Sequence, residues 1–192
     1  MNEALSALAD DSTQPILTES PTINRQRFWL AIISALIIGG ALLVWGLYDA
    51  NLHPIPVAPS FTFTAYDGTI LRSADLRGKV VVINFWASWC RPCAAEAPTL
   101  AAIWQDYQNR PDQAVVFMGV AQGDTSESAQ AFIREYGLKY ANGPDNGIVS
   151  TFGVQGLPTT FIIDRQGYIR DTLFSVIDPD DLRNRIDTAL NR

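Results

Sequence analysis

Residues 79–93 read KVVVINFWASWCRPC, and this stretch decides the fold of the chain. The run KVVVINF is nearly continuous in β-branched and apolar residues, which is typical of a strand buried on both faces of a sheet. Cys90 and Cys93 follow it, and a helix is predicted from this point to about Asn109, with a kink at Pro98. The stretch therefore predicts a buried strand and a helix, with two cysteines at their junction.

The spacing of the two cysteines predicts a reactive pair. Residues three apart at the start of a helix lie on one face, with Cα atoms about 5–6 Å apart, and this suits a Cys90–Cys93 disulfide. Free N–H groups at the helix N-terminus and the adjacent Arg91 favour a thiolate on Cys90, and Pro92 has the fixed φ of a first helical turn. We therefore expect Cys90 to attack a substrate disulfide and Cys93, one turn deeper, to resolve the mixed disulfide.

Two other interpretations of the cysteine pair are weaker. A purely structural disulfide between Cys90 and Cys93 would close almost no loop, so it would add little stability. A zinc site needs about four ligands, whereas the chain has two cysteines and a single histidine, His53. We therefore predict redox chemistry, with no metal site and no cofactor.

Composition excludes some functions and predicts a membrane segment. The 192 residues carry a net charge of −6, which argues against a nucleic-acid binder because such a protein needs a basic face. Only 18% of the residues are charged, since an uncharged apolar block occupies residues 28–48. A helix of this length is sufficient to cross the hydrocarbon core of a membrane.

The flanks of this block predict its direction. Arg25 and Arg27 precede it and no Lys or Arg follows until Arg72, so the positive-inside rule places the N-terminus in the cytoplasm. A cleaved signal peptide is the alternative, but its apolar region spans only about 7–15 residues and does not usually follow such a long polar leader. The predicted parts are a disordered cytoplasmic tail (1–27), a transmembrane helix (28–48), a Pro-rich stalk (49–60) and an extracytoplasmic domain (61–192).

The rest of the domain predicts an α/β fold. Asp124 and Glu127 form a candidate capping box for a helix that ends at Gly137, and an Asp-Pro pair at 178–179 opens a last helix. The other predicted elements are strands at 61–64, near 70 and at 114–121, a helical turn at 73–76, a helix at 125–136, and a hairpin of 159–164 and 168–174. This order, βαβ followed by ββα, predicts a mixed sheet covered on both faces.

Three stretches together carry a resemblance to a known family: NFWASWCRPC (84–93), FTFTAYDGTILRSADLRGKVVVINF (61–85) and GVQGLPTTFIIDRQGYI (153–169). They resemble the thioredoxin fold, and more closely its membrane-anchored TlpA/ResA-like branch within the AhpC/TSA-redoxin superfamily. The resemblance implies a thioredoxin-like fold, with a central mixed sheet flanked by helices. It also implies that Pro158 is a cis-proline packed against the disulfide, and that Leu157 offers backbone groups to an extended substrate chain.

One more chemical group is expected near the cysteines. Asn84 lies where ordinary thioredoxins have a buried Asp that handles protons, and an amide cannot accept a proton. Glu96, three residues after Cys93 on the same helical face, is the candidate proton acceptor, as the resemblance also implies. The alternative is an exposed acid that interacts with the helix dipole.

Aromatic and flanking residues complete the predicted site. Trp89 is expected at a rim that substrates contact, and Trp86 in the packing of the core. The substrate-binding residues expected around the cysteine pair are Trp89, Arg91, Pro92, Leu157 and Pro158.

The predicted function is that of a membrane-anchored protein thiol-disulfide oxidoreductase that reduces disulfides or cysteine pairs in extracytoplasmic proteins. The outside of a bacterial membrane is oxidising, so a reductase there needs a membrane electron donor. The resemblance implies a role in maturation of cytochrome c or assembly of an oxidase copper site. Pro158-Thr159 stands where dedicated cytochrome c maturation proteins often have Pro-Glu.

Two rival functions are kept as alternatives. A thiol peroxidase of the peroxiredoxin type needs Thr or Ser three residues before its nucleophile, whereas this chain has Ala87 there. A copper or assembly chaperone of the kind that pairs CxxxC with a distant histidine would need a histidine in the domain, whereas His53 precedes it.

Overall fold

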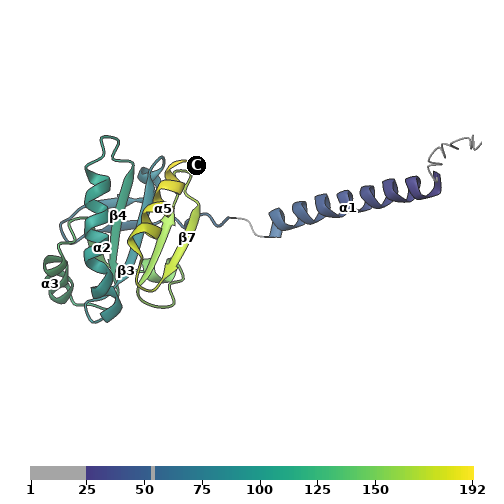
Figure 1. Cartoon of the computed structure of the whole chain (residues 1–192). Helices are drawn as coiled ribbons and strands as arrows, with labels where there is room; N and C mark the ends of the chain where they lie inside the picture. Colours follow the sequence, from purple (N-terminus) through teal and green to yellow (C-terminus); the bar gives the residue numbers. More distant parts are fainter. Residues whose placement is uncertain (1–24, 53–54) are drawn as a thin grey trace, which may run out of the picture. The chain divides into compact units, whose positions relative to one another are not determined.

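A computed structural model of the chain describes residues 25–52 and 55–192 (Figure 1). Contacts divide the chain into two compact units, Met1–His53 and Pro54–Arg192, and each is described by itself. The predicted disordered tail falls mostly on residues 1–24, which lie outside the described residues, as does His53.

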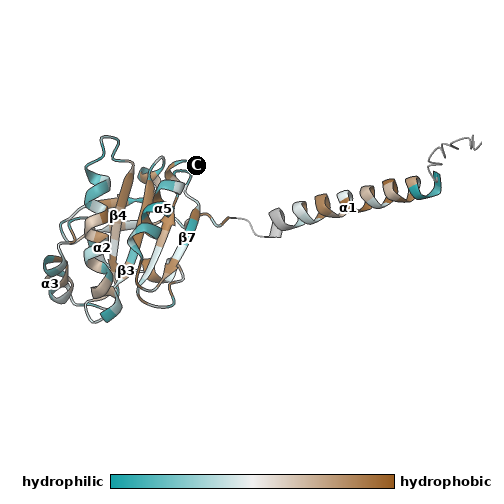
Figure 2. Cartoon of the chain, in the orientation of Figure 1, coloured by the Kyte–Doolittle hydropathy of each residue, from teal (hydrophilic) through white to brown (hydrophobic). Residues whose placement is uncertain are grey.

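The described part of the first unit is a single helix, α1 (Arg25–Leu52). By length and composition, Arg25–Tyr48 is long and apolar enough to cross a membrane. Most of its large apolar side chains are exposed, and Figure 2 shows apolar colouring along much of its length. The helix continues past the predicted end at Tyr48 because the first proline of the following segment comes only at position 54. The beginning of the predicted stalk is therefore helical.

A five-stranded mixed sheet forms the centre of the second unit. Its strands lie in the order β5-β4-β3-β6-β7. The central strand β3 (Val80–Trp86) is parallel to β4 (Val115–Ala121) and antiparallel to β6 (Thr159–Ile163). The outer strands are β5 (Ala141–Pro144), parallel to β4, and β7 (Ile169–Phe174), antiparallel to β6. The buried run 79–85 thus occupies the middle of the sheet, as its composition predicts.

Alternate residues of β3 serve the two faces of the sheet. Val80, Val82 and Trp86 pack in one core cluster with α2 (Arg91–Gln108), α3 (Ser126–Tyr136) and α5 (Pro179–Leu190). Val81, Ile83 and Phe85 pack in a second cluster beneath β1 (Thr62–Thr64), β2 (Ile70–Arg72), the 3-10 turn η1 (Ser73–Leu76) and the short helix α4 (Ile148–Thr151). Both faces are covered, which confirms the predicted mixed α/β architecture (Figure 1).

The segment before β1 is joined to the sheet. Ala58 N–H donates to the carbonyl of Gly167 at 2.9 Å, and Ile169 N–H donates to the carbonyl of Pro56 at 2.8 Å. Val57 forms an isolated antiparallel bridge with Tyr168. Residues 56–58 therefore pair with the beginning of β7, although composition alone assigns them to the extended stalk. Backbone pairing with a strand end far along the chain leaves no mark in local composition.

Three local features differ from the sequence prediction. The N-cap of α3 is Thr125, whose hydroxyl accepts from Ser128 N–H at 3.1 Å, rather than Asp124 of the expected capping box. The reason is that the Asp124 carboxylate accepts instead from Ser88, on the loop before the cysteines. The strand β5 and the helix α4 were not predicted.

Candidate active site

The cysteine pair lies at the junction of β3 and α2. Cys90 is the N-cap of α2, and its Sγ accepts from the backbone N–H of Cys93 at 3.2 Å. The two residues form a disulfide with Cα atoms 5.2 Å apart, inside the expected range. Cys90 is 6% exposed and Cys93 is 1% exposed, so Cys90 is the more accessible sulfur-bearing residue, as predicted for a nucleophile.

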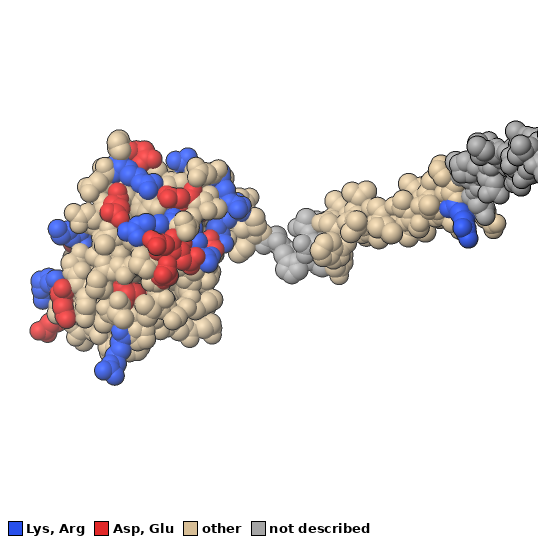
Figure 3. Space-filling model, viewed as in Figure 1, with Lys and Arg blue, Asp and Glu red and all other residues tan. Residues whose placement is uncertain are grey.

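A hollow of about 530 Å³ opens beside Cys90. Residues 89–92 form one wall, and residues 154–157 with Gln122 form the other. The rim carries exposed apolar side chains, with Trp89 64% exposed. Figure 3 shows few charged side chains on this view of the end of the domain where α2 and α5 begin. The structure thus brings Trp89, Arg91, Pro92 and Leu157 together at one hollow next to Cys90.

The second wall leads directly into β6. The Leu157–Pro158 peptide bond is cis, as the resemblance implies. The Thr159 hydroxyl donates to the carbonyl of Gly156 at 2.7 Å, which ties the start of β6 back to this wall. Ser175 N–H reaches the Pro158 carbonyl at 3.4 Å, so the loop after β7 also borders it.

A long-range contact holds the loop before the cysteines. Asp124 accepts from Ser88 N–H at 2.7 Å and from the Ser88 hydroxyl at 2.5 Å. Cys90 N–H donates to the carbonyl of Ala87 at 3.1 Å. These bonds fix the turn that presents Cys90, and sequence reasoning missed them because an Asp near a helix start is also an ordinary capping signal.

Behind the cysteines lies a buried polar group. Asn84 donates through Nδ2 to Glu96 Oε1 at 2.8 Å and to Thr160 Oγ1 at 2.9 Å. Glu96 is 1% exposed, which contradicts the alternative of an exposed acid at the helix surface. Among the described residues, Glu96 Oε2 has no hydrogen bond of normal geometry. Ordinary thioredoxins have a buried Asp at the position of Asn84. The Asn84 amide instead donates an N–H to the Glu96 carboxylate and adds no second negative charge.

Burial raises the pKa of Glu96 from 4.5 to about 7, although the hydrogen bond from Asn84 and the backbone N–H of Ile177 act to lower it. A carboxyl group with a pKa near neutrality can both take up and release a proton at physiological pH. Since Glu96 follows Cys93 by one helical turn, its position suits a proton acceptor for the resolving thiol.

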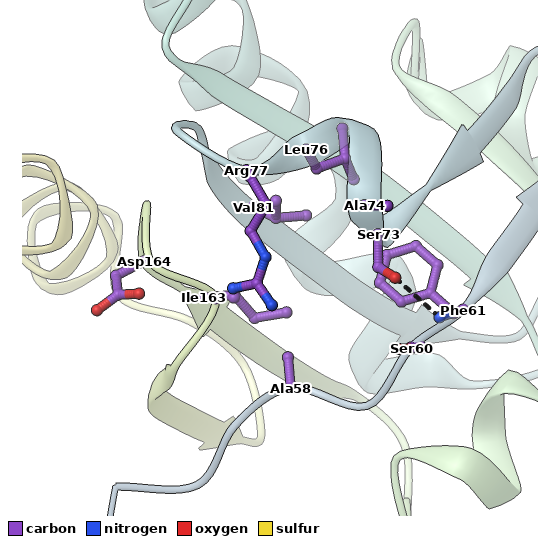
Figure 4. A pocket seen from close by; sticks show the side chains of 11 residues that line it. Ala58, Ser60, Phe61, Ser73, Ala74, Leu76, Arg77, Val81, Ile163 and Asp164 are labelled. Carbon is purple, nitrogen blue, oxygen red and sulfur yellow. Dashed lines mark hydrogen bonds between the residues drawn. The ribbon is translucent and has the colours of Figure 1, made fainter.

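A further hollow in the domain lies between the segment before β1, η1 and the β6–β7 turn (Figure 4). The Arg77 side chain extends between Ile163 and Ala58, where its guanidinium donates to the carbonyl of Gln166. Asp164 borders this hollow, and its carboxylate pairs with Arg170. This hollow contains none of the predicted site residues.

Comparisons with known proteins agree with this geometry. The sequence pattern of the AhpC/TSA family matches residues 56–172. The thiol-disulfide oxidoreductase ResA of Bacillus thuringiensis (strain Al Hakam) is 32% identical, over 77% of this chain and 87% of that protein. The thiol:disulfide interchange protein HelX of Rhodobacter capsulatus is 38% identical, over 61% of this chain and 65% of that protein.

Solved structures show the same architecture. The crystal structure of a thiol:disulfide interchange protein of the thioredoxin family from Chlorobium tepidum TLS superimposes with a TM-score of 0.65 and 26% identity, over 70% of this chain and 96% of that chain. With a redox-capable cysteine pair at the head of α2 and these relatives, the chain belongs to the AhpC/TSA family, as a TlpA/ResA-like thiol-disulfide oxidoreductase with a thioredoxin-like fold.

Proposed function

We propose that this chain is a membrane-anchored thiol reductase that acts on disulfides of extracytoplasmic proteins. The observation that carries the proposal is the asymmetry of the cysteine pair. Cys90 borders a hollow at the N-terminus of α2, whereas Cys93 is buried within the helix, one turn before Glu96, whose pKa is raised to about 7.

The proposed reaction begins with the reduced pair. The Cys90 thiolate attacks one sulfur of the substrate disulfide; the substrate S–S bond breaks, and the released substrate sulfur takes a proton. Cys93 Sγ then attacks Cys90 Sγ and gives its proton to Glu96, and the second substrate sulfur leaves as a thiolate and takes a proton from the solvent. The products are a substrate dithiol and the Cys90–Cys93 disulfide that the structure contains. The N–H groups at the head of α2 stabilise the Cys90 thiolate in both directions.

The walls of the hollow suit an extended polypeptide. We propose that backbone groups of Leu157, which lines the hollow next to the cis-Pro158, pair with a substrate segment in the manner of a strand. Three apolar side chains are exposed beside this wall and the cysteines: Trp89 (64%), Phe174 (69%) and Val176 (50%). We infer that the substrates are unfolded or flexible protein segments with apolar residues next to their cysteines.

The membrane part of the proposal rests on α1. Its length and composition suit one membrane crossing, and Arg25 and Arg27 at its start favour a cytoplasmic N-terminus. The domain would then work outside the cytoplasm, where an oxidised Cys90–Cys93 pair needs a membrane electron donor to recharge it. Protease added to intact spheroplasts should remove the domain, and protection of the domain would contradict this topology.

Within this class, we propose a role in maturation of cytochrome c or assembly of an oxidase copper site. Pro158 is followed by Thr159 rather than by an acidic residue, which favours a broader choice of substrate than that of a dedicated cytochrome c protein. Thr159 is 1% exposed and its hydroxyl is engaged with Gly156, so it presents no charge to a substrate. The peroxidase alternative is weaker, since Ala87 is fully buried and offers no hydroxyl to a peroxide.

Reduction of insulin by the reduced chain tests the proposal. Cys90→Ala should abolish the activity, and Cys93→Ala should accumulate a mixed disulfide through Cys90. Unchanged insulin reduction by Cys90→Ala would contradict the proposal. Equilibration with thiol buffers then gives the direction: a reduction potential near about −270 mV marks a reductant, whereas about −120 mV marks an oxidant and would overturn the maturation role.

A further inference from the structure

One end of the domain collects cations that have no acidic partner. Arg77 and Lys79 lie between η1 and β3, and Arg165 lies in the turn between β6 and β7. Among the residues that the structure describes, none of the three takes part in an ion pair. Arg77 and Lys79 are exposed and Arg165 is half-buried, so their charges are available to a partner outside the domain.

Hydrogen bonds hold these three residues close together. Gly78 N–H donates to the carbonyl of Arg165 at 2.9 Å, which joins the start of β3 to the β6–β7 turn. The Arg77 side chain reaches across the hollow of Figure 4 and donates to the carbonyl of Gln166. Lys79 follows Gly78 directly. We call Arg77, Lys79 and Arg165 the basic patch.

The acidic side chains around the basic patch neutralise little of it. Asp164 pairs with Arg170, and Asp187 pairs with Arg110. Asp112, in the loop before β4, has no cationic partner within the described part of the chain, so it opposes the patch with one charge. Three uncompensated cations thus face one uncompensated carboxylate, although the whole chain has a net charge of −6.

The chain enters the domain beside the basic patch. Val57 forms its antiparallel bridge with Tyr168, three residues after Arg165. The side chains of Ile55, Val57 and Tyr168 are exposed. Cations next to exposed apolar and tyrosine side chains are typical of surfaces that bind the interface of a membrane.

The length of the chain limits how far this end of the domain can lie from a membrane. In the proposed function, α1 crosses the bilayer, and Tyr48 ends its apolar part. The helix continues to Leu52, and the carbonyl of Pro56 already accepts from Ile169 of β7. Four helical residues rise about 6 Å and four extended residues span at most about 14 Å, so Pro56 lies within about 20 Å of the interface. Lipid headgroups are therefore the surface that this end of the domain meets most often.

We propose that the basic patch binds anionic lipid headgroups of the bilayer in which the chain is anchored. Lys and Arg side chains are attracted to anionic lipid within about one Debye length of the surface, which is about 8 Å at physiological ionic strength. The proposal rests on the membrane anchor of the proposed function, because the anchor supplies the short tether.

Docking of the basic patch orients the cysteine pair. Lys79 directly precedes β3, and Cys90 follows the other end of this seven-residue strand. A strand of this length spans about 23 Å, so the hollow beside Cys90 faces away from the lipid at roughly that distance. The docked domain presents its hollow to proteins in the aqueous space, whereas an electron donor within the bilayer can reach Cys90 only after the patch is released.

Nuclear magnetic resonance of the full chain in lipid nanodiscs tests the basic patch. One preparation contains phosphatidylcholine alone, and the other contains phosphatidylglycerol as well; both include a lipid with a gadolinium chelate on its headgroup, which broadens nearby amide signals. The signals of Lys79 and Tyr168 should broaden more in the anionic nanodiscs, whereas those of Cys90 and Cys93 should not. Salt at about 1 M shortens the Debye length to about 3 Å and should remove the difference.

Lys79→Gln combined with Arg165→Gln removes two cations of the patch. Each Lys or Arg beside anionic lipid changes the ratio of docked to undocked domain by about 5-fold, so the double variant should lower this ratio on the order of 20-fold. The matched control is Arg134→Gln with Lys139→Gln, which removes two exposed cations at the end of α3 and should leave the broadening unchanged. Lys79→Glu alone is a second test at an exposed position, and it should also reduce the broadening.

The outcomes separate the basic patch from the anchor. Equal broadening in both kinds of nanodisc, or broadening that the patch variants and the control change alike, would overturn the patch and leave the anchor in place. A chain that does not enter nanodiscs at all would contradict the membrane part of the proposed function, and the patch would fall with it.

Discussion

The buried Glu96 makes the stability of the domain depend on pH in a way that one substitution removes. Its folded pKa is raised from 4.5 to about 7, chiefly by burial, so the native state holds this proton more tightly than the unfolded state. Ionising the buried Glu96 carboxyl lowers the unfolding free energy of the domain. This loss is absent below pH 4.5, grows as the pH rises toward 7 and is constant above that. The shift corresponds to about 3 kcal/mol of unfolding free energy.

Glu96→Gln mimics the protonated acid and keeps an oxygen for the hydrogen bond from Asn84. The unfolding free energy of the variant minus that of the wild type should therefore rise by about 3 kcal/mol between pH 4 and pH 8. Urea denaturation of the oxidised domain, at a series of pH values, measures this difference without interference from free thiols. The domain has its own two core clusters, which suits it to study as a separate unit.

The matched control is Glu135→Gln, an exposed glutamate of α3, which should change the free energy by less than about 0.5 kcal/mol at any pH. A flat difference for Glu96→Gln across this pH range would refute the reasoning. It would mean that the carboxyl group ionises in the folded protein as easily as in the unfolded chain, and that it is not poised to accept the Cys93 proton near neutrality.

Three further predictions concern other parts of the domain. Burial raises the pKa of Asp164, but hydrogen bonds from Tyr168 N–H and Arg170 outweigh it and lower the pKa below 3.8. Asp164→Asn should therefore lower the unfolding free energy by about 2–4 kcal/mol at pH 7. In urea denaturation, the difference between wild type and variant should shrink as the pH falls through that lowered pKa. Trp89→Ala should raise KM for insulin while the rate with glutathione disulfide stays unchanged; equal losses with both would place Trp89 outside the substrate surface. Thr125→Ala removes the N-cap of α3 and should lower the unfolding free energy by about 1 kcal/mol, whereas no change would show that this cap is dispensable.

Local signals in the sequence predict much of this fold. Two features can be predicted from neighbouring residues alone, and the structure contains both. The cysteines follow a β-branched strand at the start of α2. The Asp178-Pro179 pair starts α5, where Asp178 accepts hydrogen bonds from the N–H groups of Asp180 and Asp181. The strand β5 was missed because the residues ANGP have little strand propensity. Pairing with β4 and a close approach at Gly143 hold it in place, since a Cβ there would lie 2.5 Å from the Thr64 carbonyl.

The surroundings of the candidate site were less predictable than its cysteines. Glu96 was identified by helical spacing, but its burial depends on Asn84 and on Thr160, which is 76 residues away from Asn84 in the chain. Asp124 reaches Ser88 across 36 residues. Such contacts arise from the crossing of strands and helices, and one sequence read by local patterns carries no signal for them.

The pairing of residues 56–58 with the start of β7 protects the domain against edge-to-edge aggregation. An outer strand with free N–H and C=O groups is a template on which further chains add, and β7 is the outer strand on one side of the sheet. There, Ile169 N–H donates to the Pro56 carbonyl, and Ala58 N–H donates to the Gly167 carbonyl. A soluble fragment cut at residue 61, where the strand pattern begins, would uncover those groups and should aggregate more readily than one that keeps residue 56 onward.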